Sequence, residues 1–201
     1  RVLPNPRIQQ QTRRGTGIMG KRSDFKRVER DFYPTPLDAV LPLVPHLPGG
    51  YSYWEPCAGD GALIRHLYNS GNCVACSDIE PCGFEGWMQK MDALNVTLEA
   101  ANVSGADYII TNPPWDRKIL HPMIEHFSSM RPTWLLFDAD WMHTKQSTPY
   151  MDYCQKIVSV GRVKWIPDSK MTGKDNAAWY LFDQDPTLAH EATKFYGRLT
   201  E

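Results

Sequence analysis

From Phe32 onward, short apolar runs alternate with segments in which apolar residues recur at helical spacing. Apolar runs of four to eight residues indicate buried strands, and recurrence every three to four positions indicates helices that cover one face of a sheet. The pattern predicts strands over residues 51–54, 73–77, 87–91, 106–111, 134–137, 157–166 and 177–182. It predicts helices over residues 61–70, 96–103, 117–130 and 148–155.

Strands that alternate with helices indicate an α/β fold with right-handed crossovers. The seven predicted strands should form a Rossmann-like, doubly wound, mostly parallel sheet with helices on both faces. Ligands of such sheets bind beyond the carboxyl ends of the strands, where the strand order reverses. The residues that directly follow the strands are mostly polar. They occupy positions 55–61, 78–81, 92, 112–115 and 138–143.

Composition narrows the class of protein. The chain has 201 residues, of which 42% are hydrophobic and 22% charged, values typical of a single globular domain that buries a core. No apolar run approaches the ~20 residues of a membrane-spanning helix. Five cysteines are too few and too odd in number for a secreted disulfide scaffold, and no signal segment begins the chain. We therefore expect a cytoplasmic protein without a membrane partner.

Charge is unevenly distributed along the chain. Residues 1–30 contain nine of the 22 Lys and Arg but only two of the 23 Asp and Glu, so this segment is basic and the remainder is acidic. Such an arm is typical of a tail that binds polyanions, and a solvated, disordered extension is the alternative. Met19 is an alternative natural start. The arm residues proposed to contact nucleic acid are Arg13, Arg14, Lys21 and Arg22.

A glycine turn follows the first predicted strand. Residues 55–61 read Glu-Pro-Cys-Ala-Gly-Asp-Gly, and a helix follows at once. Gly59 and Gly61 allow backbone to approach a ligand closely, and the helix amino terminus favours an anionic group. A P-loop lysine is absent, and position 64 is Ile rather than the third glycine of a dinucleotide fingerprint. The turn by itself equally fits a tight strand-to-helix connection.

An acidic residue follows the second predicted strand. Asp78 comes 17 positions after Gly61, where doubly wound folds place a carboxylate that binds ribose hydroxyls. A helix or turn cap is the alternative role for this side chain.

A proline corner follows the strand that ends at Thr111. Residues 112–115 read Asn-Pro-Pro-Trp, and both prolines restrict the backbone. The Asn112 side-chain oxygen and the Pro113 carbonyl can then act as two fixed acceptors for an –NH2 group, directing its lone pair at an electrophile. Trp115 adds a flat face on which a planar ring can stack. A plain Pro-Pro turn is the alternative.

These segments, with residues 32–36 (Phe-Tyr-Pro-Thr-Pro), resemble motifs X, I and IV of the class I S-adenosylmethionine-dependent amino-methyltransferases. They are most similar to the DNA adenine-N6 methyltransferases of phage and prophage type, in the order of the gamma arrangement. The resemblance extends over about residues 31–184, and includes residues 161–183 as closing strands. It implies a catalytic domain over residues 31–201 and a bacterial or phage-infected host cell.

The resemblance also implies a role for each matching residue. The methionine end of S-adenosylmethionine would contact Tyr33, Thr35 and Pro36. The cofactor floor would be formed by Glu55, Cys57, Gly59 and Gly61. The ribose and the cofactor's adenine would be held by Asp78, Ile79 and Asp92. The target adenine would be held by Asn112, Pro113, Pro114 and Trp115.

The implied reaction is methylation of adenine N6 in DNA, by alignment and without a covalent intermediate. The base would be flipped out or supplied single-stranded. Because the chain ends 86 residues after Trp115, we expect no separate target-recognition domain and low or loop-encoded sequence specificity. Phosphate contacts would come from the loops over residues 140–150 and 167–176, through Lys145, Lys170 and Lys174.

Other functions stay open at this point. Asn-Pro-Pro is shared with RNA and protein-glutamine methyltransferases, so RNA adenine or guanine, DNA cytosine-N4 or a protein glutamine is an alternative acceptor. A non-catalytic nucleic-acid-binding module on the same fold is a second alternative. The oligomeric state is undetermined.

Two further chemistries are disfavoured. A zinc site at Cys73, Cys76 and Cys82 lacks a fourth ligand, and we expect no metal. Cys57 lies in the cofactor turn and not where a cytosine-5 nucleophile would sit. His121 and His126 are five positions apart, which favours a helix surface over metal ligation.

Overall fold

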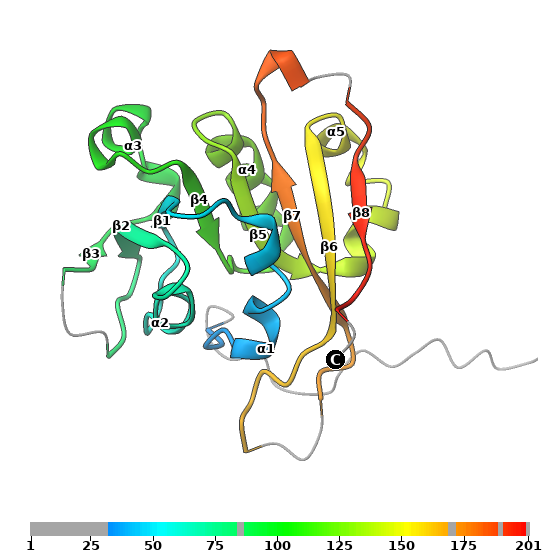
Figure 1. Ribbon diagram of the computed structural model, residues 1–201, viewed down its shortest axis with the longest axis horizontal. Helices are drawn as coiled ribbons and strands as arrows, with labels where there is room; N and C mark the ends of the chain where they lie inside the picture. Colours follow the sequence, from blue (N-terminus) through cyan, green and yellow to red (C-terminus); the bar gives the residue numbers. More distant parts are fainter. Residues whose placement is uncertain (1–31, 84–86, 169–171, 189–190, 200–201) are drawn as a thin grey trace, which may run out of the picture.

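The computed structural model describes residues 32–83, 87–168, 172–188 and 191–199 (Figure 1). One sheet of eight strands forms its centre, in the order β3-β2-β1-β4-β5-β7-β6-β8. The strands are β1 (Ser52–Glu55), β2 (Asn72–Asp78), β3 (Gln89–Lys90), β4 (Tyr108–Thr111), β5 (Thr133–Asp138), β6 (Cys154–Arg162), β7 (Asn176–Phe182) and β8 (Lys194–Tyr196). The basic arm, residues 1–30, lies outside the described residues.

Strand directions confirm the α/β fold with a mostly parallel sheet. Strands β1 to β5 are parallel to one another, and β7 runs antiparallel between β5 and β6. The chain proceeds from β1 outward to β2 and β3, then returns to the other side of β1 with β4 and β5. The strand order therefore reverses between β1 and β4.

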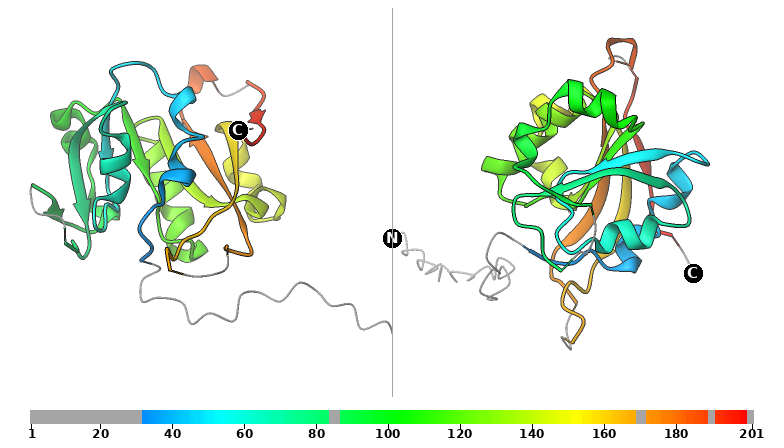
Figure 2. Two further views of the ribbon diagram at one scale, coloured as in Figure 1. Left: turned by 60° about the horizontal axis from the view of Figure 1, so that its bottom comes forward. Right: turned by 90° about the vertical axis from the view of Figure 1, so that its left-hand side faces the viewer.

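Helices cover both faces of the sheet, as predicted (Figure 2). Side chains of α1 and α2 belong to one apolar cluster, and those of α3, α4 and α5 to another. The helices are α1 (Leu37–Val40), α2 (Ala62–Leu67), α3 (Leu98–Ser104), α4 (Arg117–Ser128) and α5 (Thr148–Met151). The short 3-10 helices are η2 (Val44–His46), η3 (Ala93–Asn95), η4 (Ala139–His143) and η5 (Pro186–Leu188). Within the described ranges, every helix is too short or too polar to traverse a lipid bilayer.

Alternation along the central strands explains the two-sided core. Ile109 on β4 and Leu135 on β5 pack against the α4 cluster, whereas Ile110 and Trp134 pack against the α2 cluster. Successive side chains of a strand point to opposite faces, so a strand buried on both sides needs a continuous apolar run. These apolar runs are the pattern from which the strands were predicted.

Several boundaries differ from the prediction. The predicted helix over residues 148–155 is too long, because Cys154 already pairs with Phe182 in the antiparallel ladder of β6 and β7. Strand β6 ends at Arg162, four residues earlier than predicted, just after a register shift at Gly161. Strand β8 brings the count to eight; its pairing with β6 is a long-range contact that its short sequence, Lys-Phe-Tyr, does not signal.

Candidate functional site

The polar residues that follow the strands meet at one edge of the sheet. Glu55 ends β1, Asp78 ends β2, and Asn112 directly follows β4. Since these strands are parallel neighbours, their carboxyl ends lie together, on either side of the point where the strand order reverses. In Figure 1 the gold connection between β6 and β7 leaves from the same edge. We take this edge as the candidate site.

The glycine turn after β1 has the backbone shape that its sequence suggests. Gly59 and Gly61 both have left-handed φ angles, +54° and +77°. A Cβ on Gly59 would lie 2.7 Å from Cε2 of Phe32, so the segment over residues 32–36 crosses directly over this turn. Asp60 completes the turn by accepting a hydrogen bond from the Ala62 amide at 2.9 Å. The turn is therefore tight, and side-chain-free at Gly59.

Asp78, the last residue of β2, links the glycine turn to that strand by hydrogen bonds. Its Oδ2 accepts a hydrogen bond from the Gly59 amide at 2.8 Å, and its Oδ1 accepts one from the Glu80 amide at 2.7 Å. This is the capping role that was the alternative to ribose binding. Each carboxylate oxygen retains a further lone pair, so the two roles are compatible. Ile79, beside it, is 51% exposed.

Asp92 lies farther along the same edge, after β3. Its Oδ1 accepts from the Leu94 amide at 3.0 Å and caps η3. The side chain is exposed. Asp92 and Ile79 thus line the part of the edge on the β2–β3 side of the glycine turn.

Glu55 is the most unusual group of the edge. It is only 2% exposed, and its Oε2 has no hydrogen-bond partner in the described part of the chain. Burial, more than the neighbouring Cys76 and Asp78, raises the pKa of Glu55 well above its ordinary value of 4.5. A buried carboxyl group without a partner is costly to fold. A ligand that offers a hydrogen-bond donor, such as the amino group of a methionine moiety, fits this position.

We expect Glu55→Gln to stabilise the ligand-free protein at alkaline pH. In the wild type, the folded state holds the Glu55 proton more tightly than the unfolded chain does. This proton stabilises the wild-type fold fully below pH 4.5, and its stabilisation is lost as the pH rises through the folded pKa. The loss is about 1.4 kcal/mol per pH unit between the two pKa values.

Thermal unfolding of both proteins from pH 4 to pH 9 checks this expectation. The melting temperature of Glu55→Gln should exceed that of the wild type at pH 8 and approach it near pH 4. Glu99→Gln, on an exposed position of α3, is the matched control and should change little. A Glu55→Gln protein that is less stable at both pH values would show that the carboxyl has a partner.

Cys57 lies half-buried in the same turn. Burial, the largest cause, raises the pKa of its thiol well above the ordinary range. The thiolate form needed by a nucleophile is therefore disfavoured, in agreement with the rejection of a cytosine-5 mechanism.

The proline corner presents a carboxamide that is held at both ends. Nδ2 of Asn112 donates to Oγ1 of Thr35 at 3.1 Å, and Nε1 of Trp115 donates to Oδ1 of Asn112 at 3.3 Å. An indole N–H can only donate, so the atom facing Trp115 must be the amide oxygen. That oxygen keeps a second lone pair for a ligand. Pro113 is buried and Pro114 is partly buried.

Residues 32–36 connect the two halves of the edge. Phe32 packs on Gly59, and Thr35 bonds to Asn112. Tyr33 and Pro36 are half-buried, and Pro36 precedes α1 in an extended conformation. The three segments identified in the sequence therefore meet in space.

Trp165 also lies at the candidate site, and the sequence analysis did not include it. Its ring lies perpendicular to that of Trp115, with centroids 5.5 Å apart, and both indoles are half-buried. The sequence analysis placed Trp165 inside the predicted strand over residues 157–166, where a tryptophan is interpreted as a core residue. Because β6 runs in the same direction as β5, residues after Arg162 emerge at the candidate edge.

Two of the predicted phosphate contacts can be located. Lys145 follows η4, which begins where β5 ends, and Lys174 lies in the connection from β6 to β7. Both are exposed, at the candidate edge. The remaining predicted contacts, Lys170, Arg13, Arg14, Lys21 and Arg22, lie outside the described residues.

The histidines of α4 have structural partners. Trp141 Nε1 donates to Nε2 of His121 at 3.0 Å, and Nε2 of His126 lies 2.7 Å from the Val96 carbonyl oxygen. They are therefore more than helix-surface residues. Across the residues that the structure describes, no three His, Cys, Asp or Glu side chains are grouped so as to hold a metal ion.

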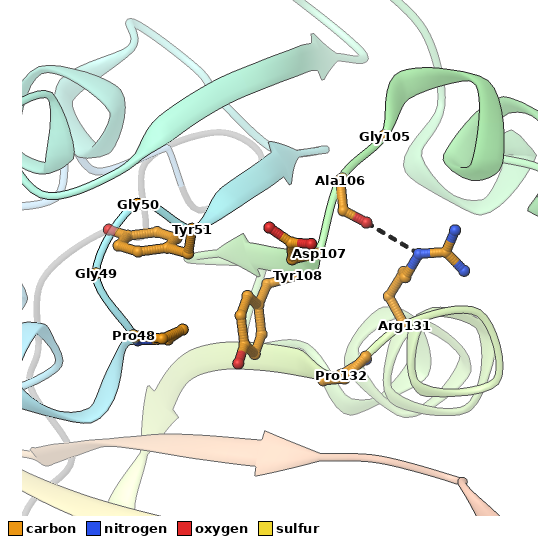
Figure 3. Close-up of a pocket in the computed structure, with 10 residues that line it drawn as sticks. All are labelled: Pro48, Gly49, Gly50, Tyr51, Gly105, Ala106, Asp107, Tyr108, Arg131 and Pro132. Atoms are coloured by element: carbon orange, nitrogen blue, oxygen red, sulfur yellow. Dashed lines mark hydrogen bonds between the residues drawn. The ribbon is translucent and has the colours of Figure 1, made fainter.

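A hollow of about 610 Å³ opens at the opposite edge, where β1, β4 and β5 begin (Figure 3). Its charged groups are already paired within the protein. Nε of Arg131 donates to the Ala106 carbonyl at 2.9 Å, and the Asp107 carboxylate accepts from the amide and hydroxyl of Ser52. Its position at the amino ends of the strands sets it apart from the candidate site.

The chain matches no protein-family model and no curated protein. Its fold does match solved structures. A candidate class I S-adenosylmethionine-dependent methyltransferase from Listeria monocytogenes superposes with a TM-score of 0.58 at 10% identity, over 88% of this chain and 68% of that one. A dimethyladenosine transferase from Plasmodium falciparum gives 0.51 at 16% identity, over 78% and 64%.

The modification subunit of a candidate type I restriction enzyme from Vibrio vulnificus gives a TM-score of 0.50 at 14% identity. The superposition covers 85% of this chain and 48% of that subunit, so this chain spans about half of the subunit's length. Sequence identities this low carry information about fold alone. The chain therefore shares its α/β fold, with a mostly parallel sheet, with the class I S-adenosylmethionine-dependent methyltransferase structure that it matches.

Proposed function

We propose that the protein transfers a methyl group from S-adenosylmethionine to the exocyclic N6 amine of adenine in DNA. The observation that carries the proposal is the Asn112 carboxamide, held between Thr35 and Trp115 beside the glycine turn. The fold and the names of two fold relatives, a dimethyladenosine transferase and a restriction-modification subunit, support this class of acceptor.

The glycine-turn half of the edge would hold the cofactor. Oε2 of Glu55 is a buried acceptor without a partner among the residues that the structure describes, and Gly59 leaves room for close approach of the methionine end. Asp78 retains lone pairs for ribose hydroxyls, and Ile79 exposes an apolar surface for a purine. When bound there, S-adenosylmethionine supplies an electrophilic methyl group on sulfonium sulfur.

The proline corner would hold the target base. Oδ1 of Asn112 and the Pro113 carbonyl each accept one hydrogen of the amine, which aims its lone pair toward the cofactor side of the edge. Trp115 and Trp165 supply aromatic surface, and stacking of one base on such a ring is worth about 1–3 kcal/mol. That gain offsets much of the cost of taking a base out of the helix, which is a few kcal/mol.

Lys145 and Lys174 would contact the phosphates around the flipped base. Both side chains are exposed, and each comes from a connection at the candidate edge. Phosphate contacts position a protein without reading sequence, which accords with low sequence specificity.

The decisive experiment offers radiolabelled S-adenosylmethionine with four acceptors: duplex DNA amplified without methylation, single-stranded DNA, RNA and a protein extract. Digestion and mass spectrometry then identify the modified nucleoside. We expect N6-methyladenine in DNA, and none with Asn112→Ala. Label on RNA, on cytosine or on protein would instead identify another planar amine as the acceptor. Cofactor binding without transfer to any of the four would indicate a binding module.

A further inference from the structure

Thr35 contacts the proline corner from a segment far away in the sequence. Its side chain is 6% exposed, and its Oγ1 accepts the hydrogen bond from Nδ2 of Asn112 at 3.1 Å. The two residues are 77 positions apart. This is the contact by which residues 32–36 reach Asn112.

The orientation of the Asn112 carboxamide decides what it can bind. With Nδ2 toward Thr35, Oδ1 is available to accept a hydrogen from a target amine. After a half-turn of the amide, Nδ2 would face the amine instead, and two donors would oppose each other. The donor-only N–H of Trp115 selects this orientation, because a hydroxyl could donate as well as accept. The Thr35 hydroxyl tethers the Nδ2 end and so fixes the plane of the amide.

Trp115 alone does not hold the amide in place. Its N–H bonds to Oδ1, the same atom that the amine needs, and the distance is longer, 3.3 Å against 3.1 Å. The Thr35 contact uses the other end of the amide and does not compete with the substrate. Thr35 accordingly keeps Oδ1 oriented while leaving it available.

We propose that Thr35 is a positioning residue for the transfer reaction, acting through Asn112. This inference rests on the proposed function, and it assigns the Thr35 hydroxyl to Asn112 in place of the cofactor contact expected from the sequence. Its hydroxyl oxygen, rather than its bulk, is the group that matters.

The test compares Thr35→Val, which keeps the shape and removes the acceptor, with Thr35→Ser, which keeps the hydroxyl. We expect Thr35→Val to lower kcat by about 10- to 100-fold, because a displaced acceptor misaligns the amine. Thr35→Ser should remain within about threefold of the wild type. Calorimetric titration with S-adenosylhomocysteine should give dissociation constants that agree within about threefold for all three proteins.

A binding measurement gives a second readout that needs no turnover. The wild type, with S-adenosylhomocysteine present, should bind an oligonucleotide containing adenine about five- to tenfold more tightly than one in which purine, lacking the amine, replaces adenine. Thr35→Val should lose this preference and Thr35→Ser should keep it. If Thr35→Val does not fold, Thr35→Ala takes its place in both measurements.

The outcomes separate the two proposals. An active wild type with a fully active Thr35→Val, or with equal losses in the valine and serine variants, would overturn the positioning role alone. A loss confined to S-adenosylhomocysteine affinity would overturn it as well and leave Thr35 as a cofactor contact. A wild type that transfers no methyl group to any acceptor would overturn the proposed function and this inference with it.

Discussion

Replacing Asn112 by alanine is expected to lower kcat for methyl transfer by about a thousandfold or more, because the target amine loses an acceptor that is fixed before the reaction begins. Cofactor affinity should stay nearly unchanged. The side-chain hydrogen bonds of Asn112 go to Thr35 and Trp115, and neither partner belongs to the glycine turn. Single-turnover kinetics and titration with S-adenosylhomocysteine measure the two quantities separately.

Two further variants sharpen this expectation. Asn112→Asp keeps an acceptor oxygen and should retain more activity than Asn112→Ala. Asn69→Ala, exposed beyond the end of α2, is the matched surface control and should behave as the wild type. Full activity of Asn112→Ala would show that the proline corner takes no part in methyl transfer.

Gly59→Ala is expected to lower kcat/KM by about a hundredfold, because the added methyl group displaces the segment that joins the two halves of the site. Its Cβ would lie 2.7 Å from the ring of Phe32, and its φ angle of +54° disfavours any side chain. The left-handed backbone alone costs about 1–2 kcal/mol of stability. Displacement of Phe32 should carry Thr35 with it, so both cofactor affinity and kcat are affected.

Gly105→Ala is a matched control for the backbone effect. Gly105 also has a left-handed φ angle, +70°, but a Cβ there would meet no atom within 4 Å, and it lies at the opposite edge of the sheet. Thermal unfolding should show a similar loss of stability in both variants, while only Gly59→Ala loses cofactor affinity. Equal cofactor affinity in the two alanine variants would show that the turn does not touch the cofactor.

The order and type of the central elements were predictable because they depend on local patterns. Strand β4 and helix α4 were expected within one or two residues of their observed bounds, since apolar periodicity reports directly which face each element buries. The edge where the candidate site lies was predictable for the same reason: in a parallel sheet, the residues after successive strands must converge.

Misjudged elements are those whose state depends on a distant partner. Strand β8 is a short Lys-Phe-Tyr segment that exists through its pairing with β6. The helix predicted over residues 148–155 cannot extend past residue 153, because β6 begins at Cys154 and pairs with β7. Trp165 reads as one more core residue of a strand until the direction of β6 is known.

The sequence by itself determined the α/β architecture, the glycine turn and the proline corner, because each follows from the spacing and backbone preferences of neighbouring residues. Only the tertiary structure decided that Thr35 holds the Asn112 amide, that Trp165 stands against Trp115, and that Oε2 of Glu55 is buried without a partner among the described residues. These features arise from contacts between residues far apart along the chain, and local sequence patterns carry no information about which distant groups will meet.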